Sequence, residues 1–413
     1  MAADSKPLIA AHSIGAQRVH KRLLLVALVC GGAAASALIL HAAPTPFFWL
    51  WLTWAVVCFV AIGCVSRDWQ RSILLFIGLL SCLLACLEVY LSSHEYRPPI
   101  YPDGGYILPD SVLGWAPPPG IRARAISRAP DGLFHHSRGT IFDVTYTIDS
   151  SGLRVAPPYR KDELAGTILF FGCSFTVGEG LPDNETLPYQ TGALSDGRYR
   201  TFNFAFHAYG ANQMLAAIEH GRVEKIVDGG AQEAFYVAIP DHVWRVAGKV
   251  PWGGNAPRYV LAADGSVVQH GVMKDQPTLA DRLHLKHGVR QLNKWALWRA
   301  ISNPEGRITP DDIRLYLAVV ERSREDLEAQ FPGIRFRILL WPPQDTDAQH
   351  RRVYEQMRDG FQRMQIPTYL VQDALPGYST DREKYILSTV DRHPNALADQ
   401  ILAQYVLQLV ARK

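Results

Sequence analysis

Apolar residues are concentrated at the beginning of the chain. Three runs, Leu23–Leu40, Phe47–Val65 and Ile73–Leu91, contain Glu88 as their only charged residue. Each run approaches the about 20 apolar residues that a helix needs to cross a bilayer. The pattern predicts a cytoplasmic segment over 1–22 and three transmembrane helices over 23–92, with a buried three-helix hairpin of a soluble protein as the alternative.

Basic residues near the ends of these runs predict their orientation. The first connection, HAAPTP, has no Lys or Arg, whereas basic residues precede the first run and lie in the second connection: Lys6, Arg18, Lys21, Arg22, Arg67 and Arg71. Since cytoplasmic loops carry the excess of Lys and Arg, the N-terminus is expected in the cytoplasm. A cleaved signal at Leu40-His41-Ala42 would give the same location for the rest of the chain. We therefore expect a multi-pass protein of the inner (cytoplasmic) membrane, with everything after Ser92 on the periplasmic side.

The remaining residues change pattern twice. Residues 93–166 are rich in Pro and Gly and contain one clear alternating strand, Ile141–Ile148, which predicts a small β-rich lead-in. From 167 to 413, buried strands alternate with helices, namely strands Thr167–Phe171, Thr201–Phe204, Ala234–Ile239, Arg335–Leu340 and Thr368–Val371 and helices Ala211–Val227, Pro310–Gln330, Asp347–Met364 and Ala396–Leu409. This rhythm predicts a three-layer α/β/α domain with a mostly parallel sheet. An insertion at about 247–303 holds a predicted hairpin, RYVLAADGSVVQHG, and a helix with Trp295 and Trp298.

Composition removes some classes of function. The chain of 413 residues has 42 basic and 39 acidic residues, a net charge of +3, which gives no signature of nucleic-acid binding. Five of its six cysteines lie in the apolar runs, and only Cys173 belongs to the exported part. The sequence thus predicts no disulfide framework, and a domain of roughly 320 residues is large enough to rely on its own core.

The stretch ILFFGCSFTVGEG, residues 168–180, is the main candidate for chemistry. A phosphate-binding loop needs a Lys after its last Gly, but Glu179 follows Gly178, and the glycines do not have the spacing of a dinucleotide site. The other interpretation is that Ser174 is a nucleophile at the end of a strand. It requires a base, and the loop Asp391-Arg-His393-Pro before the last helix offers a histidine with a carboxylate two residues away.

These residues occur in blocks that resemble the SGNH/GDSL hydrolase family, in particular its bacterial, membrane-anchored, esterase-like branch. The blocks appear in the family's order: GCSFTVGEGLPDNETLP, FNFAFHAYGANQML, FYVAIPDHVWR and DRHPNALADQILA, with LGWAPPPG and TYTIDSSGLR upstream. The resemblance covers roughly residues 110–409. It implies an SGNH-type fold with Ser174 as nucleophile, His393 as base and Asp391 as the acid that orients it.

The chain departs from the family's pattern at several positions. Cys173 replaces the usual Asp before the nucleophile, and Ala208 replaces a Gly whose N–H group contributes to the oxyanion hole. The usual Asn donor of the third block is missing, and alignment by the strand places His242 there. The resemblance thus implies an oxyanion hole of Ser174, Ala208 and His242. Because the acid lies two rather than three residues before His393, Asp381 or a backbone carbonyl remains an alternative to Asp391.

Together, these features predict a membrane-anchored serine ester hydrolase that removes an acyl group, acetyl in particular, from a cell-envelope glycan or lipid-linked sugar. Two alternatives stay open: an O-acyltransferase on the same substrates, and a non-catalytic glycan-binding domain in an export or assembly system. The expected partners are an acylated glycan or small ester and the bilayer, without nucleic acid. No metal or cofactor is expected, since the pairs His284/His287 and His135/His136 lack a third ligand.

Overall fold

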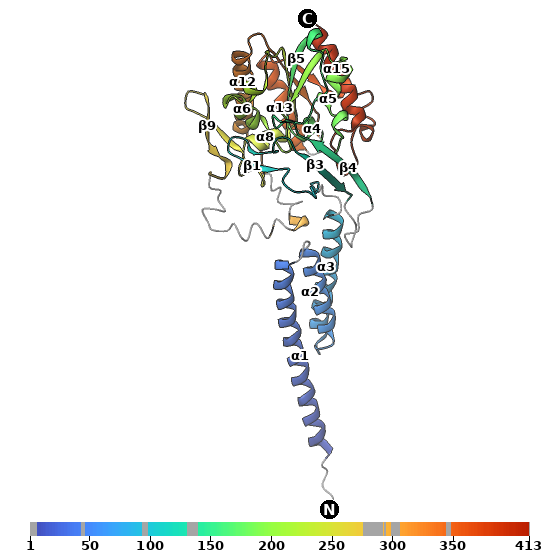
Figure 1. The fold of residues 1–413 in the computed structure, drawn as a ribbon. Coiled ribbons are helices and arrows are strands. Elements are labelled where there is room, and N and C mark those ends of the chain that lie inside the picture. The colour runs from blue at the N-terminus through green and yellow to red at the C-terminus, as the bar shows by residue number, and fades with distance from the viewer. Residues whose placement is uncertain are drawn as a thin grey trace, which may run out of the picture. The chain divides into compact units, whose positions relative to one another are not determined.

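A computed structural model describes residues 6–42, 46–92, 98–129, 139–275, 292, 295–298, 306–343 and 348–412. The chain divides into two compact units (Figure 1). The first consists of Met1–Glu95, Pro130–His136 and Thr278–Asn303, and the second consists of Tyr96–Ala129, Ser137–Pro277 and Pro304–Lys413. The predicted helical segment and most of the predicted exported part therefore fall into different units.

The first unit contains three successive helices at the predicted positions. They are α1 (Lys6–Ala42), α2 (Pro46–Ile62) and α3 (Asp68–Ser92). Val19–Leu40 of α1 and all of α3 have the length and apolar character of membrane-crossing helices, whereas α2 is an apolar helix of only 17 residues. Two of the three predicted spans are thus long enough to cross a membrane, and a third crossing by α2 stays a prediction.

Part of the insertion packs on these helices. The Glu88 side chain of α3 is buried, and its carboxylate accepts hydrogen bonds from the backbone N–H groups of Ala296 and Leu297 at 2.7 and 3.1 Å. The ring of Trp295 stacks on Phe47 of α2 with centroids 5.2 Å apart. Near the end of α3, the Glu88 carboxylate therefore binds backbone donors of the insertion.

The second unit is built on a five-stranded parallel sheet. Its strands β5 (Gly166–Phe171), β6 (Tyr199–Asn203), β7 (Glu233–Ala238), β10 (Arg335–Leu340) and β11 (Thr368–Leu370) lie in the order β11-β10-β7-β5-β6. All five match predicted strands to within a few residues. The predicted α/β class with a mostly parallel sheet is confirmed.

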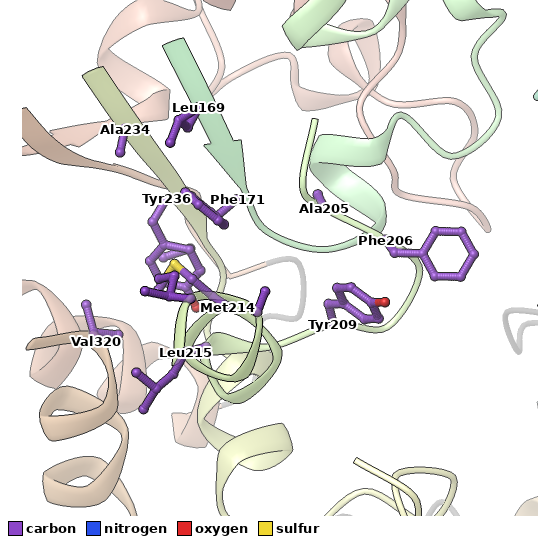
Figure 2. Close-up of a cluster of buried hydrophobic side chains, with 14 of the residues drawn as sticks. Leu169, Phe171, Ala205, Phe206, Tyr209, Met214, Leu215, Ala234, Tyr236 and Val320 are labelled. Carbon is purple, nitrogen blue, oxygen red and sulfur yellow. The ribbon is translucent and has the colours of Figure 1, made fainter. Parts of the chain in front are cut away.

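Alternate residues of the strands face opposite helical layers. In β5, Ile168 and Phe170 pack into one cluster with α15 (Ala396–Ala411), while Leu169 and Phe171 pack into another with α6 (Ala211–Glu219), α12 (Pro310–Gln330) and α13 (Ala348–Arg363). Figure 2 shows part of the second cluster, where side chains of β5 and β7 meet those of α6 and α12. The burial pattern of β5 and β7, buried at every position, follows from this two-sided packing.

Local signals set most helix ends. Helix α12 begins at Pro310 as predicted, because Thr309 and Asp312 form a capping box. The predicted helix Ala211–Val227 is wrong as one element. It is interrupted after α6, and α7 (Arg222–Ile226) starts after Gly221, which has a φ of +66°. A residue in the left-handed region ends a helix, and glycine adopts it without steric cost.

The remaining elements are short. Helices α4 (Ser174–Val177), α5 (Leu187–Leu194), α8 (Asp241–Val246) and α14 (Val371–Ala374) were not predicted. The lead-in forms two antiparallel pairs, β1 (Leu108–Asp110) with β2 (Gly114–Ala116) and β3 (Arg122–Arg128) with β4 (Thr140–Thr147). The predicted hairpin of the insertion is confirmed as β8 (Pro257–Leu261) and β9 (Val267–Val272). The lead-in and the sheet belong to the same compact unit.

Candidate active site

Because all five strands are parallel, the loops that follow them emerge at one edge of the sheet, where ligands bind in open α/β sheets. Strand β5 leads into Gly172-Cys173-Ser174 and the short helix α4. Gly172 has a φ of +154°, and a Cβ atom there would lie 2.2 Å from Thr176 Oγ1. Only glycine permits this tight exit from the strand, and the turn brings Ser174 to the sheet edge.

The serine, histidine and aspartate that the sequence predicts lie in one hydrogen-bonded chain. Ser174 Oγ is 2.7 Å from His393 Nε2, and His393 Nδ1 is 2.6 Å from Asp391 Oδ1. Ser174 and Asp391 are 6% and 0% exposed, and the His393 side chain is 13% exposed. With its Nδ1–H donated to the carboxylate, the imidazole presents the Nε2 lone pair to the serine hydroxyl.

The loop before α15 explains how a spacing of two residues suffices. Asp391 Oδ1 also accepts the backbone N–H of His393 at 3.2 Å, so one carboxylate oxygen binds both the main chain and the ring. The N–H of Asp391 donates to Ser388 Oγ at 2.8 Å, and Asn395 caps α15 by accepting from Ala398 N–H. Asp381, the alternative acid, is exposed. Asp391 is the carboxylate whose geometry fits the role.

The charges around His393 act in opposite directions. Burial lowers the pKa of its imidazole, but the negative charge of Glu179 and the hydrogen bond and charge of Asp391 outweigh that effect and raise the pKa above its usual range. The positive charge of Arg245 opposes them. The net result favours the imidazolium form, which is the form the base takes after it has accepted a proton.

The loop after β6 gives Ala208 an unusual backbone. Its φ is +63°, in the left-handed region that non-glycine residues rarely enter. Within the part of the chain that the structure describes, the Ala208 N–H has no hydrogen-bond acceptor. The alanine therefore adopts the conformation for which the family's pattern has glycine, and it keeps a backbone donor.

His242 lies in the protein core, with 0% exposure. Its Nδ1 is 2.6 Å from the hydroxyl of Tyr236, on whose ring it stacks. Burial and the charge of Arg245 hold its pKa well below the usual range, so the ring is neutral. Its Nε2 has no hydrogen-bond partner among the described residues. The structure thus gives His242 a packing role under the sheet edge, and its role as oxyanion donor stays a prediction.

Three polar residues of the site were not assigned a role from the sequence. The guanidinium of Arg154 is buried and donates to the carbonyl groups of Val177, Gly178 and Leu181 at 2.5–2.6 Å, which fixes the loop after Ser174. Glu179 and His207 form a buried pair. Arg154 ends the upstream segment TYTIDSSGLR, so a sequence signal existed, but Glu179 and His207 offered only their presence in the blocks.

Glu179, Asp391 and His393 each place one ligand-type atom within 4.8 Å of the others, a spacing that also suits a cation. These atoms already take part in the contacts of the serine site, with His393 Nδ1 on Asp391 and Glu179 on His207. We interpret the cluster as acid–base groups. The histidine pairs His135/His136 and His284/His287, which the sequence predicts not to bind a metal, lie outside the described residues.

Comparisons with known proteins point to one group of structures. The sequence matches no family model and no curated protein. Similar solved structures include a lipolytic protein of the G-D-S-L family from Veillonella parvula (13% identity, TM-score 0.35, 60% of this chain and 99% of that one) and one described as a putative member from Desulfitobacterium hafniense (11%, 0.31, 59% and 99%). An acetylxylan esterase from Geobacillus stearothermophilus is also similar (12%, 0.33, 60% and 96%). Two of these three structures carry the name of the G-D-S-L family, which the motifs of this chain resemble.

Proposed function

We propose that this protein is a membrane-anchored serine ester hydrolase of the SGNH type. The observation that carries the proposal is the continuous hydrogen-bonded chain from Ser174 Oγ through His393 to Asp391. A serine hydroxyl becomes a nucleophile when an oriented base accepts its proton, and this chain supplies both the base and the group that orients it. The resemblance of the surrounding blocks gives the same assignment.

In the proposed reaction, Ser174 Oγ attacks the ester carbonyl while its proton moves to His393 Nε2. The tetrahedral intermediate then breaks its bond to the alcohol oxygen, which takes the proton from His393, and an acyl-serine remains. A water molecule gives a proton to His393 and attacks the acyl carbonyl. The second tetrahedral intermediate breaks its bond to Ser174 Oγ, which takes the proton back from His393, and the carboxylic acid leaves. The Asp391 carboxylate accepts the Nδ1–H of His393 and stabilises the imidazolium in both half-reactions.

The negative charge on the carbonyl oxygen requires donors. The backbone N–H groups of Ser174 and Ala208 are the best candidates, and His242 is a third. Each oxyanion donor contributes on the order of 100–1,000-fold in rate. The left-handed backbone of Ala208 supports its role, because a strained conformation persists where the surrounding structure requires it.

For the substrate, we infer an acetyl or other small acyl ester on a cell-envelope glycan or lipid-linked sugar. The apolar helices support a location at a membrane. On the second unit, Trp252 is 50% exposed, and its ring lies 6.0 Å from Trp115. The indole N–H of Trp115 donates to the carbonyl of His207, next to Ala208. An exposed aromatic face near the oxyanion loop suits the C–H face of a sugar ring.

The test uses the full chain in detergent micelles and an alkyl phosphonate probe. We expect covalent labelling at Ser174, no labelling of Ser174→Ala, and a strong decrease in His393→Gln. A folded wild-type protein that is not labelled would contradict the proposal and favour a non-catalytic glycan-binding domain. Acetate released from an acetylated oligosaccharide, compared with acetyl transferred to an added sugar, separates hydrolysis from O-acyl transfer.

The predicted topology has its own test. A reporter fused after Lys413 is expected to report a periplasmic location, because the basic residues beside the apolar runs predict a cytoplasmic N-terminus. A cytoplasmic signal would contradict both the three-span prediction and the proposed access to envelope substrates.

A further inference from the structure

Glu179 is a buried carboxylate that the proposed reaction does not use. It lies five residues after Ser174, between Gly178 and Gly180, and is 4% exposed. Its Oε2 is 2.6 Å from His207 Nδ1, and its Oε1 is 3.9 Å from His393 Nδ1. The catalytic histidine is therefore faced by two carboxylates, Asp391 in direct hydrogen bonding and Glu179 at ion-pair distance.

We propose that Glu179 is a positioning residue that stabilises the positively charged form of His393 and, through His207, holds the loop that presents Ala208. The inference rests on the proposed serine hydrolase function. One side chain would thus act on two parts of the site: the proposed base, His393, and the loop of the proposed oxyanion donor, Ala208.

The contacts of His207 support the proposed role of Glu179 in holding the loop that presents Ala208. Its Nε2 is 3.1 Å from the hydroxyl of Tyr106, and its carbonyl accepts the indole N–H of Trp115 at 2.9 Å. With Nδ1 donating to Glu179, both ring nitrogens and the carbonyl of His207 are engaged. The residue before Ala208 is thus fixed at three points, one of which is Glu179.

The loop that carries Glu179 is fixed as well. The N–H of Gly180 donates to the hydroxyl of Tyr146 at 2.8 Å, and the carbonyl of Gly178 accepts from Arg154 at 2.6 Å. A Cβ atom at Gly178 or Gly180 would lie 2.4 Å from a neighbouring side-chain carbon. The two glycines permit the close packing that places the carboxylate between His207 and His393.

The charges facing this site explain why a second carboxylate matters. His393 is exposed to the fields of Asp391, Glu179 and Arg245. The titratable groups whose fields reach Glu179 are Tyr101, Tyr106, Tyr146 and His393, and its direct partner is His207, while Arg154 lies near the same tyrosines. In the reaction, His393 is the group that gains a positive charge. The charge of Arg245 disfavours the imidazolium, and the nearby buried charge of Glu179 offsets that effect, because few water molecules screen it from His393.

The test compares Glu179→Gln with the wild type, as full chains in detergent. The amide keeps the shape of the side chain and removes its charge. Two quantities are measured against pH: the chemical shift of the His393 ring carbon Cε1, assigned by its loss in His393→Gln, and kcat/KM for a soluble aryl acetate. We expect the His393 titration and the rise of kcat/KM to move to lower pH. The maximal kcat/KM should fall on the order of ten- to a hundredfold, the range for losing one charge-assisted hydrogen bond.

Controls distinguish positioning from a structural effect. Asp399→Asn removes another buried carboxyl and should leave both pH midpoints unchanged. Glu179→Asp keeps the charge, and the His393 titration should return toward the wild-type position even where kcat/KM stays low. If Glu179→Gln does not fold, the Glu179→Asp titration, compared with that of His207→Gln, carries the test. Glu179→Asp, whose shorter side chain draws the carboxylate back from His393, should move the titration part of the way to lower pH. His207→Gln keeps the carboxylate in place and should weaken kcat/KM with little change in the titration.

The outcomes are separable from those of the proposed function. An unchanged His393 titration in folded Glu179→Gln overturns this inference, whatever the activity. Absence of phosphonate labelling in the wild type overturns the hydrolase proposal, whereas the His393 titration still reports on Glu179.

Discussion

The carboxyl of Asp399, in the first turn of α15, gives a sharp prediction on stability. The residue is 1% exposed, its Oδ2 accepts the N–H of Leu187 at 2.9 Å, and its Oδ1 has no partner among the described residues. Burial raises its pKa from 3.8 to about 8, although the Leu187 hydrogen bond and the charge of Arg154 lower it in part. The folded protein therefore holds this carboxyl protonated at neutral pH.

The pH dependence follows from the two values. Below pH 3.8 the carboxyl is protonated in both the folded and the unfolded chain, so its protonation does not change the free energy of unfolding. As the pH rises from 3.8 to about 8, the unfolded chain ionises and the folded protein does not, so stability is lost progressively. Each pH unit costs about 1.4 kcal/mol, which gives roughly 3 kcal/mol between pH 5 and pH 7. Asp399→Asn removes this titration.

Thermal unfolding in detergent, followed by tryptophan fluorescence at pH 5, 6 and 7, measures the effect. We expect the Tm of Asp399→Asn minus that of the wild type to increase with pH by roughly 5–10 °C over this range. The buried amide donor that Asp399→Asn introduces without a partner changes the Tm by the same amount at every pH. The test is therefore how the Tm difference changes with pH, not its absolute size. The exposed Asp381→Asn is the matched control and should show no slope. A Tm difference independent of pH would refute the reasoning.

Three further predictions concern the site. Because neutral His393 is the proposed base and its pKa is raised, kcat/KM should increase with pH through a midpoint above the usual histidine value of 6.5. A midpoint below that value would contradict the assigned charges. Ala208→Gly should raise the free energy of unfolding by about 0.5–1 kcal/mol in a denaturant titration, because glycine adopts a positive φ without steric cost. The variant should retain activity. A decrease in stability would contradict a strained backbone at Ala208. Arg154→Met removes a donor from three buried carbonyl groups, of which, among the described residues, only that of Gly178 keeps another, the Leu181 N–H. It should lower stability by roughly 3–5 kcal/mol and abolish phosphonate labelling, whereas the exposed Arg352→Met should do neither.

The sheet could be predicted from the sequence because its strands are short apolar runs bounded by turns and helices. Strands β5, β7 and β10 are buried on both faces, and their mostly apolar composition predicts that burial. Helix α12 was predictable at both ends, since Thr309-Pro310 is a local start signal. The break at Gly221 was missed because a glycine within an apolar pattern is also tolerated inside a helix.

The pair of Ser174 and His393 lies 219 residues apart in the sequence and was predicted from its position in two blocks and from the rule that parallel strands end at one edge. Glu179 and His207 had no such rule. Each is a common polar residue in a loop, and their contact depends on how the turns after β5 and β6 pack against each other. The sequence contains both residues but does not specify that packing in any local pattern.

The departures from the family's pattern become connected in the folded protein. Alanine at position 208 costs strain of about 1–2 kcal/mol in the left-handed region, and such strain persists only where the neighbours hold the backbone. Here His207 is fixed by Glu179 and Trp115, and the carbonyl of Tyr209 accepts from Arg245 at 2.6 Å. The residues on both sides of Ala208 are therefore held by groups that also set the charge around His393. Glu179→Gln should for this reason weaken the proposed base, His393, and also loosen the proposed oxyanion donor, Ala208. Ala208→Gly, which alone retains activity, should therefore lower kcat/KM in the Glu179→Gln background, so that the two substitutions are not additive.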